Sequence, residues 1–201
     1  MKYFKQELAK PITDQTPFAT VIVPCKGLDE GLRENLEAVM LQNYPLYEVV
    51  FVVDDANDRA MGAIREIARE GAVSTKSVVA PLAVESGQKV ENLREAVLHA
   101  DDRSEVFVFV DSDVRPAEDW LRSLVAAVED KSIGAATGYR WFVAEQSDLA
   151  TELRSAWNAS IASALGPDTG SNFCWGGSTA IRRAVFERLD IRDKWRGTLS
   201  D

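Results

Sequence analysis

Two carboxylates separated by a single residue are the part of this sequence best suited to chemistry. Asp111 and Asp113 flank Ser112 directly after the apolar run at 106–110. Mg²⁺ and Mn²⁺ prefer oxygen ligands and are often held by one or two carboxylates together with phosphate oxygens. A metal held in this way bridges a diphosphate and offsets the negative charge that grows on a departing nucleoside diphosphate. The alternative interpretation is a solvated strand-to-helix turn in which Asp113 caps the next helix.

Polar residues also follow the other apolar runs of the first half. Lys26 comes after the run at 19–23, and Asp54 comes directly after the run at 48–53. An aspartate at such a place can accept a hydrogen bond from the base or ribose of a nucleotide, although acidic residues are common in turns. Lys89 lies at the start of an expected helix and within reach of a nucleotide or its phosphates. Considered alone, Lys89 is more simply explained as a surface lysine.

A loop near the end of the chain is the third candidate. Trp175 offers a ring that can stack on a sugar or a lipid, and the adjacent Gly176 and Gly177 allow a ligand to approach the backbone closely. With Ser178, these residues are assigned to the sugar or acceptor side of a site. The alternative is a tight turn around a core tryptophan.

The histidine and the cysteines carry no clear chemical signal. His99 lies near the end of an expected helix, where a structural role is usual. Cys25 and Cys174 are far apart and match no metal-ligand spacing, so we expect two ordinary buried thiols in a reduced, cytoplasmic environment.

Composition sets the broad class of the protein. The chain has 201 residues, of which 46% are hydrophobic and 27% charged, as expected for one globular domain with a sizeable core. With 32 acidic and 23 basic side chains, the formal net charge is −9. That charge argues against binding to a phosphate backbone, so no nucleic-acid partner is expected. No apolar segment is long enough for a signal peptide or a membrane-spanning helix.

Apolar runs alternate with segments of helical period through most of the chain. This alternation predicts an α/β fold with a mainly parallel central sheet and helices on both faces, in which ligands bind at the carboxyl ends of the strands. We expect an N-terminal arm over 1–18 and one domain over 19–201. The expected strands are 19–23, 48–53, 77–80 and 106–110, with one or two further strands from the segments 133–138 and 139–143. The expected helices are 29–42, 61–68, 88–99, 116–128 (with Pro116 in its first position), 149–165 and 179–189, with a loop over 166–177.

Five motifs in a fixed order carry a family resemblance. They are Val21-Ile-Val-Pro-Cys-Lys-Gly27, Val52-Val-Asp-Asp55, Gly87-Gln-Lys-Val-Glu-Asn92, Val110-Asp-Ser-Asp113 and Trp175-Gly-Gly-Ser-Thr-Ala-Ile-Arg182. Together they resemble family 2 glycosyltransferases, and most closely the ceramide glucosyltransferase-like branch. The resemblance covers roughly residues 19–201. It implies a GT-A fold, a nucleoside-diphosphate sugar donor, with UDP favoured, and a divalent metal, Mg²⁺ or Mn²⁺.

The resemblance also implies roles for individual residues. The nucleotide would be surrounded by Pro24, Lys26 and Asp54, with Lys89 nearby. Asp111 and Asp113 would serve the diphosphate and the metal, Asp113 as the more direct ligand. An acceptor hydroxyl would attack in line, with inversion at the anomeric carbon, while a carboxylate removes its proton.

That carboxylate should come from a third acidic motif, usually an acidic pair. Asp201 resembles the first member of the pair, and the base itself would be the next residue, which the sequence lacks. The family's later arginine- and tryptophan-containing motif and its membrane helices are also missing. We therefore expect a domain truncated at its C-terminus, from a parent enzyme at the cytoplasmic face of a membrane that acts on a lipid acceptor.

Three other functions are compatible with parts of the sequence. A catalytically inactive fragment that binds a nucleotide-sugar is the strongest alternative. A haloacid dehalogenase-type phosphatase also places Asp-x-Asp after an apolar strand, but normally near the start of its domain. A sugar nucleotidyltransferase should have a longer glycine-rich loop after its first strand than Pro24 to Gly27 provides.

Overall fold

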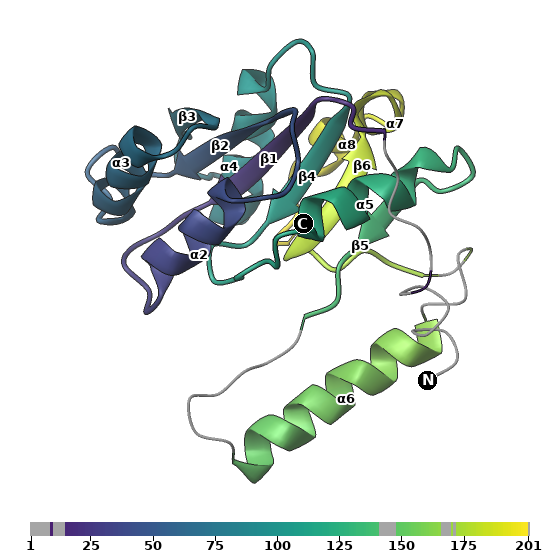
Figure 1. The fold of residues 1–201 in the computed structure, drawn as a ribbon. Coiled ribbons are helices and arrows are strands. Elements are labelled where there is room, and N and C mark those ends of the chain that lie inside the picture. Colours follow the sequence, from purple (N-terminus) through teal and green to yellow (C-terminus); the bar gives the residue numbers. More distant parts are fainter. Residues whose placement is uncertain (1–8, 10–14, 141–147, 166–169, 171, 201) are drawn as a thin grey trace.

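A sheet of six strands in the order β3-β2-β1-β4-β6-β5 forms the centre of the computed structural model, which describes residues 9, 15–140, 148–165, 170 and 172–200 (Figure 1). β1 pairs in parallel with β2 and β4, and β2 pairs in parallel with β3. β6 runs antiparallel to both β4 and β5. The expected mainly parallel sheet is therefore confirmed. The strands are β1 Ala19–Pro24, β2 Tyr47–Val53, β3 Ser74–Val79, β4 Val106–Val110, β5 Ala135–Thr137 and β6 Ser178–Arg182.

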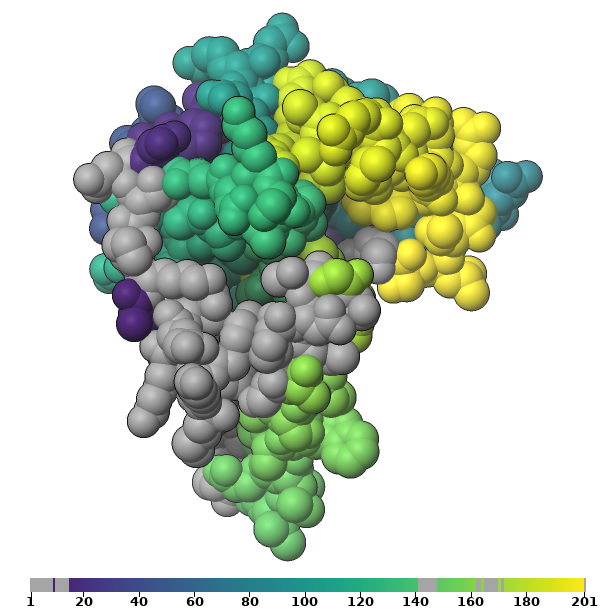
Figure 2. Space-filling view, turned by 90° about the vertical axis from the view of Figure 1, so that its right-hand side faces the viewer, coloured from purple at the N-terminus to yellow at the C-terminus, as the bar shows by residue number. Residues whose placement is uncertain are grey.

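Helices cover both faces of the sheet (Figure 1). Side chains of α2 Leu32–Met40, α3 Ala60–Glu70 and α5 Trp120–Glu129 pack in one apolar core. Side chains of α4 Gln88–Ala96, the 3₁₀ turn η1 Val97–His99, α7 Arg183–Arg188 and α8 Ile191–Lys194 belong to the core on the other face. The longest helix, α6 Leu149–Leu165, projects from one end of the molecule, away from the C-terminal residues (Figure 2).

Alternating side chains in the central strands explain the two cores. In β1, Val21 and Val23 face the core with α2, whereas Ile22 faces the core with α4. All five residues of β4 are buried, with Phe107 and Phe109 on the α4 side. Near-continuous apolar strands of this kind are typical of a sheet covered on both faces. β3, at the edge of the sheet, has only one buried residue, Val78, which fits its weaker apolar pattern.

The helix expected over 179–189 is wrong in its first part. Residues Ser178–Arg182 form a strand, and the helix begins only at Arg183. The physical reason is the open edge of β4, because its backbone groups need partners and β6 supplies them in register. Ala180 then faces one core and Ile181 the other, which is a period of two residues rather than of a helix.

Two other expected elements differ in extent. α5 begins at Trp120, so Pro116 precedes the helix instead of occupying its first position. The carbonyls of Ala117 and Glu118 instead accept hydrogen bonds from Gln42 and Asn43 at the end of α2, which holds this segment out of the helix. The strand expected over 139–143 is not formed at Tyr139 and Arg140, and the rest of it lies outside the described residues. Within the described part of the chain, no helix is both long and apolar enough to cross a bilayer.

Candidate active site

The antiparallel strand β6 brings the second half of the chain to the carboxyl end of β4. Val110, the last residue of β4, lies opposite Ser178, the first residue of β6. The amide of Asp111 donates a hydrogen bond to the carbonyl of Gly177 at 3.2 Å. Two segments that the sequence analysis treated separately, the acidic triplet and the Trp-Gly-Gly-Ser loop, are therefore neighbours.

Asp111 is held by two cations. Lys89 Nζ lies 2.8 Å from Asp111 Oδ1, and Arg140 Nη2 donates to Asp111 Oδ2 at 3.1 Å. The carboxylate side chain is 24% exposed and the two cationic side chains are 38% and 39% exposed, so the cluster is open to solvent. Lys89 sits in the first turn of α4, at the position where the sequence analysis expected it to reach the phosphates of a nucleotide.

Gly177 leaves space for this arrangement of side chains. A methyl group at Gly177 would overlap the Arg140 guanidinium and would lie 2.8 Å from Asp111 Oδ2. Contacts so short are not tolerated without movement of a neighbour. The glycine that the sequence analysis assigned to close approach of a ligand therefore also makes room for an arginine.

Asp113 differs sharply from Asp111. Its side chain is exposed and makes no hydrogen bond or ion pair with other described residues. The turn that carries it is fixed through Ser112, whose carbonyl accepts a hydrogen bond from Asn35 Nδ2 at 3.1 Å. Arg115 Nε donates to the other end of the same amide, at Asn35 Oδ1. The turn is thus anchored to α2 while the Asp113 carboxylate is left open to a ligand.

The donor set fits a divalent metal that is completed by a substrate. Among the described residues, no three histidine, cysteine or acidic side chains gather as a metal cage. One open carboxylate at Asp113 and a second, ion-paired one at Asp111 are what Mg²⁺ or Mn²⁺ uses when phosphate oxygens supply further ligands.

At the end of β2, Asp54 pairs with Lys26. Lys26 Nζ lies 2.9 Å from Asp54 Oδ2, and the Asp54 side chain is 10% exposed whereas that of Lys26 is 74% exposed. The hydrogen bond to Asp54, and then its charge, raise the pKa of Lys26 above its ordinary value. Pro24, the last residue of β1, lies opposite Val52 of β2, two residues before Lys26. Donor binding by these three residues stays a prediction.

Asp58 has a role in the same corner that the sequence analysis missed. Its Oδ1 accepts hydrogen bonds from the amides of Gly27, at 2.9 Å, and Ala60, at 2.7 Å. The carboxylate therefore ties the loop after β1 to the start of α3. Gly27 has φ 68°, a backbone conformation that favours glycine. The glycine at this position is therefore the sequence signal for a sharp turn in the loop.

The Trp-Gly-Gly-Ser loop is held mainly through its backbone. Trp175 is 36% exposed, and its amide and carbonyl both bond to the hydroxyl of Thr137. Ser178 Oγ accepts a hydrogen bond from Trp120 Nε1 at 2.9 Å, in space that the missing side chain of Gly138 leaves. Ser178 therefore fixes the loop to α5, while the ring of Trp175 stays accessible. Contact of this loop with a sugar or acceptor stays a prediction.

The cysteines behave differently from each other. Cys25 is buried as expected, at 1% exposure, but Cys174 is exposed, so the expectation of two buried thiols is wrong for Cys174. The reason is that Cys174 belongs to the loop before β6, outside the covered faces of the sheet.

The end of the described chain returns to the site. The Gly87 amide donates to the Thr198 carbonyl at 2.8 Å, and the Gly197 amide donates to Ser86 Oγ at 3.0 Å. Residues 197–199 thus lie against the N-terminus of α4, where Gly87 stands two residues before Lys89. Asp201, which the sequence analysis assigned to the acidic base motif, lies outside the described residues.

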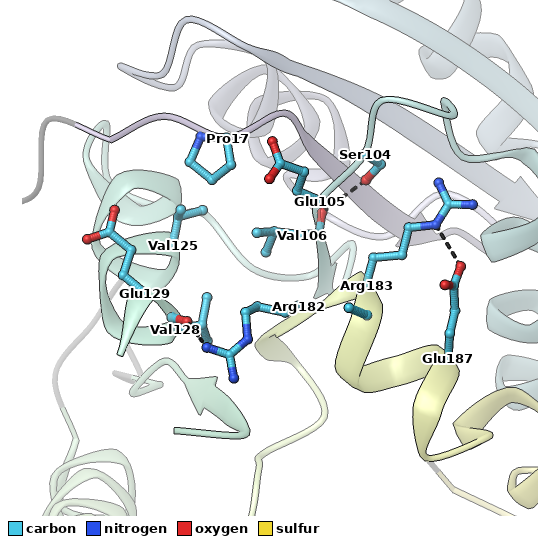
Figure 3. Close-up of a pocket in the computed structure, with 11 residues that line it drawn as sticks. Pro17, Ser104, Glu105, Val106, Val125, Val128, Glu129, Arg182, Arg183 and Glu187 are labelled. Carbon is cyan, nitrogen blue, oxygen red and sulfur yellow. Dashed lines mark hydrogen bonds and ion pairs between the residues drawn. The ribbon is translucent and has the colours of Figure 1, made fainter. Parts of the chain in front are cut away.

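A cavity of about 340 Å³ lies at the opposite end of the sheet (Figure 3). It is lined by Val106 at the start of β4 and Arg182 at the end of β6, and by residues of α5 such as Val128. Arg182 is committed there, because its guanidinium donates to the carbonyls of Val128 and Ile133 among others. This cavity is remote from Asp111 and is not part of the site.

Comparison with known proteins identifies the family of this fold and site. The sequence model of glycosyl transferase family 21 matches residues 2–190. Hyaluronan synthase of Streptococcus pyogenes is 33% identical over 138 residues, which cover 66% of this chain but only 32% of the synthase. The chain therefore spans about a third of the length of this curated relative.

Solved structures agree on the architecture. The mannosyltransferase PcManGT from Pyrobaculum calidifontis, in complex with GDP-Man and Mn²⁺, has a TM-score of 0.65 and 25% identity over 94% of this chain and 53% of its own. TarS 1–349 of S. aureus, in complex with UDP-GlcNAc, has a TM-score of 0.54 at 19% identity, over 87% of this chain and 48% of that one. The family match and these structures confirm the GT-A fold and exclude the phosphatase alternative. The chain belongs to glycosyl transferase family 21 and is a glycosyltransferase domain.

Proposed function

We propose that this domain binds a nucleoside-diphosphate sugar, with UDP as the nucleotide, in a metal-dependent manner, and presents it for inverting transfer to an acceptor hydroxyl. One observation carries the proposal: the open carboxylate of Asp113 lies two residues from Asp111, which itself holds two cations. A carboxylate ready for a metal and cations ready for phosphates are the two requirements of a diphosphate site. The complex of the similar mannosyltransferase with GDP-Man and Mn²⁺ supports the choice of metal.

Different residues along this edge of the sheet would bind different parts of the donor. Asp113, with Asp111, would hold the metal, which supplies positive charge against the leaving diphosphate. Pro24, Lys26 and Asp54 would surround the nucleoside, and Lys89 would bind a phosphate. In the transfer, the bond from the anomeric carbon to the diphosphate oxygen breaks while the acceptor oxygen bonds to the same carbon from the opposite side. The acceptor proton passes to a carboxylate of the acidic motif that begins at Asp201.

A lipid acceptor and a parent enzyme at the cytoplasmic face of a membrane are part of the same proposal. They rest on the ceramide glucosyltransferase-like motifs, and the exposed Trp175 on the loop beside Asp111 is compatible with either a sugar or a lipid. The alternative to transfer is a domain that binds the donor without turning it over.

Calorimetry separates these functions. We expect UDP and UDP-glucose to bind in the presence of Mn²⁺ and to bind much more weakly when the metal is chelated. Absence of metal-dependent binding for both UDP and GDP would contradict the proposal. Binding without release of UDP from UDP-glucose would identify the chain as a donor-binding domain whose catalysis needs further residues.

A further inference from the structure

Arg140 belongs to none of the motifs that identify the family, yet it contacts the first aspartate of the acidic triplet. It lies three residues after β5, in a segment that the sequence analysis expected to be a strand. Its position is fixed through the backbone. Asn158 Nδ2, on α6, donates to the Arg140 carbonyl, and Asn158 is 5% exposed. The neighbouring Gly138 amide donates to the Ser178 carbonyl at 2.8 Å.

Stability of the fold does not account for this arginine. Its side chain is 39% exposed and that of Asp111 is 24% exposed, and ion pairs in such solvated surroundings add little to the stability of a protein. Lys89 already neutralises the same carboxylate through its other oxygen. Arg140 is therefore a second cation on a carboxylate whose negative charge is already balanced by Lys89.

Local charge indicates what that positive charge is for. Asp111 and Asp113 together carry the charge needed to balance one divalent metal. The diphosphate of a bound donor then remains to be balanced, and Lys89 and Arg140 are the cations that contact the carboxylate beside it. A guanidinium also presents a planar fork of donors, which matches phosphate oxygens in pairs.

We propose that Arg140 is a second diphosphate-binding residue of the donor site, which pairs with Asp111 when no donor is present and turns to a phosphate oxygen when a donor binds. This proposal rests on the proposed function, since it names a residue of the same site. Gly177 is the structural device that permits it, because any side chain there would occupy the space of the guanidinium.

The first test compares nucleotides that differ only in phosphate. Arg140→Met keeps an unbranched apolar side chain and removes the charged guanidinium. We expect it to weaken binding of UDP with Mn²⁺ by about tenfold to a hundredfold, because hydrogen bonds to charged groups contribute about 1.5–3 kcal/mol. Binding of UMP should weaken less. Arg65→Met, at an exposed position of α3, is the matched control and should leave both affinities unchanged.

Two further variants separate binding from folding. Arg140→Lys keeps a positive charge and should lose less affinity for UDP than Arg140→Met. It also provides a second test of the proposal if Arg140→Met does not fold. Gly177→Ala should displace the guanidinium and reproduce part of the loss, whereas Gly134→Ala, which has open space around it, should not. Thermal unfolding of each variant checks that the fold is kept.

The outcomes test the role of Arg140 separately from the proposed binding of a nucleoside-diphosphate sugar. If wild-type protein binds neither UDP nor GDP with Mn²⁺, the proposed function and the inference fail together. If wild-type protein binds UDP and Arg140→Met binds it equally well, the inference alone is overturned. Equal losses for UDP and UMP would also overturn it, since they would make Arg140 a support of the whole site instead of a ligand of the diphosphate.

Discussion

Gly87 at the start of α4 is joined to Thr198 near the end of the chain by a hydrogen bond of 2.8 Å from its amide. A methyl group at Gly87 would overlap the carbonyl of Leu199. The segment that leads to Asp201, which we propose begins the acidic base motif, therefore rests on the same helix terminus that carries Lys89 toward Asp111. A substitution in either the C-terminal segment or the start of α4 should therefore alter the structure of the other.

Gly87→Ala should loosen the C-terminal segment. We expect a loss of about 1–3 kcal/mol in the free energy of unfolding, as for other overpacked sites, and faster hydrogen exchange over residues 195–200. Gly62→Ala is the matched control, because Gly62 lies within α3 with open space around its Cα and the substitution should stabilise that helix. Unchanged exchange at 195–200 in Gly87→Ala would show that this contact does not anchor the segment.

Asp113→Asn should remove metal-dependent donor binding without affecting stability. Loss of an outer partner of a metal already costs about tenfold to a hundredfold in affinity, so loss of a direct ligand should cost at least as much for UDP in Mn²⁺. The melting temperature should not fall, since the Asp113 side chain is exposed and has no partner among the described residues. Asp102→Asn, also exposed, is the control. Calorimetry and a melting curve check both statements, and full affinity in Asp113→Asn would exclude this residue as a ligand.

Phe186→Ala should be among the most destabilising single changes in the C-terminal part of the domain. Phe186 is 4% exposed and packs edge-on against Phe107 of β4 and Trp195, with ring centroids 5.3 Å and 5.5 Å away. Removing a buried phenylalanine costs about 3–5 kcal/mol, measurable by urea denaturation. Leu189→Ala, at 43% exposure, should cost about 1 kcal/mol or less. Similar losses for the two variants would contradict the packing described.

The two cysteines should differ in reactivity toward a thiol reagent. Burial, and then the charge of Asp58, raise the pKa of Cys25 to about 12, so this thiol should react only when the protein unfolds. Cys174 lies on the exposed loop, although partial burial raises its pKa too. Since only the thiolate reacts, labelling of Cys174 in folded protein should become faster as the pH rises toward its raised pKa. Cys174→Ser is the control, and rapid labelling of that variant in the folded state would contradict the burial of Cys25.

The strands and the edge where the proposed site lies could be predicted from the sequence, because β1, β2 and β4 are nearly continuous apolar runs that are followed by polar residues. The order of motifs then indicated the family. Strand β6 could not be predicted in the same way. Its five residues acquire strand geometry from the edge of β4, a partner far away in the sequence.

Contacts between distant segments were also beyond the sequence. Arg140 has no neighbouring motif that marks it, and its proposed importance depends on a fold that brings the segment after β5 beside Asp111. Asp58 belongs to no motif, and only the structure shows that its carboxylate accepts a hydrogen bond from the amide of Gly27. Such roles depend on what faces a side chain, which local periodicity does not contain.

Strand β6 has a consequence for solubility as well. It covers the edge of β4, whose five residues are all buried and apolar. An uncovered edge of this composition is a template for pairing with another chain. A shorter version that ends before Ser178 would therefore self-associate through β4 and would not remain as a dispersed nucleotide-binding half. We therefore expect the same strand to protect β4 from aggregation and to bring Gly177 to the proposed donor site beside Asp111.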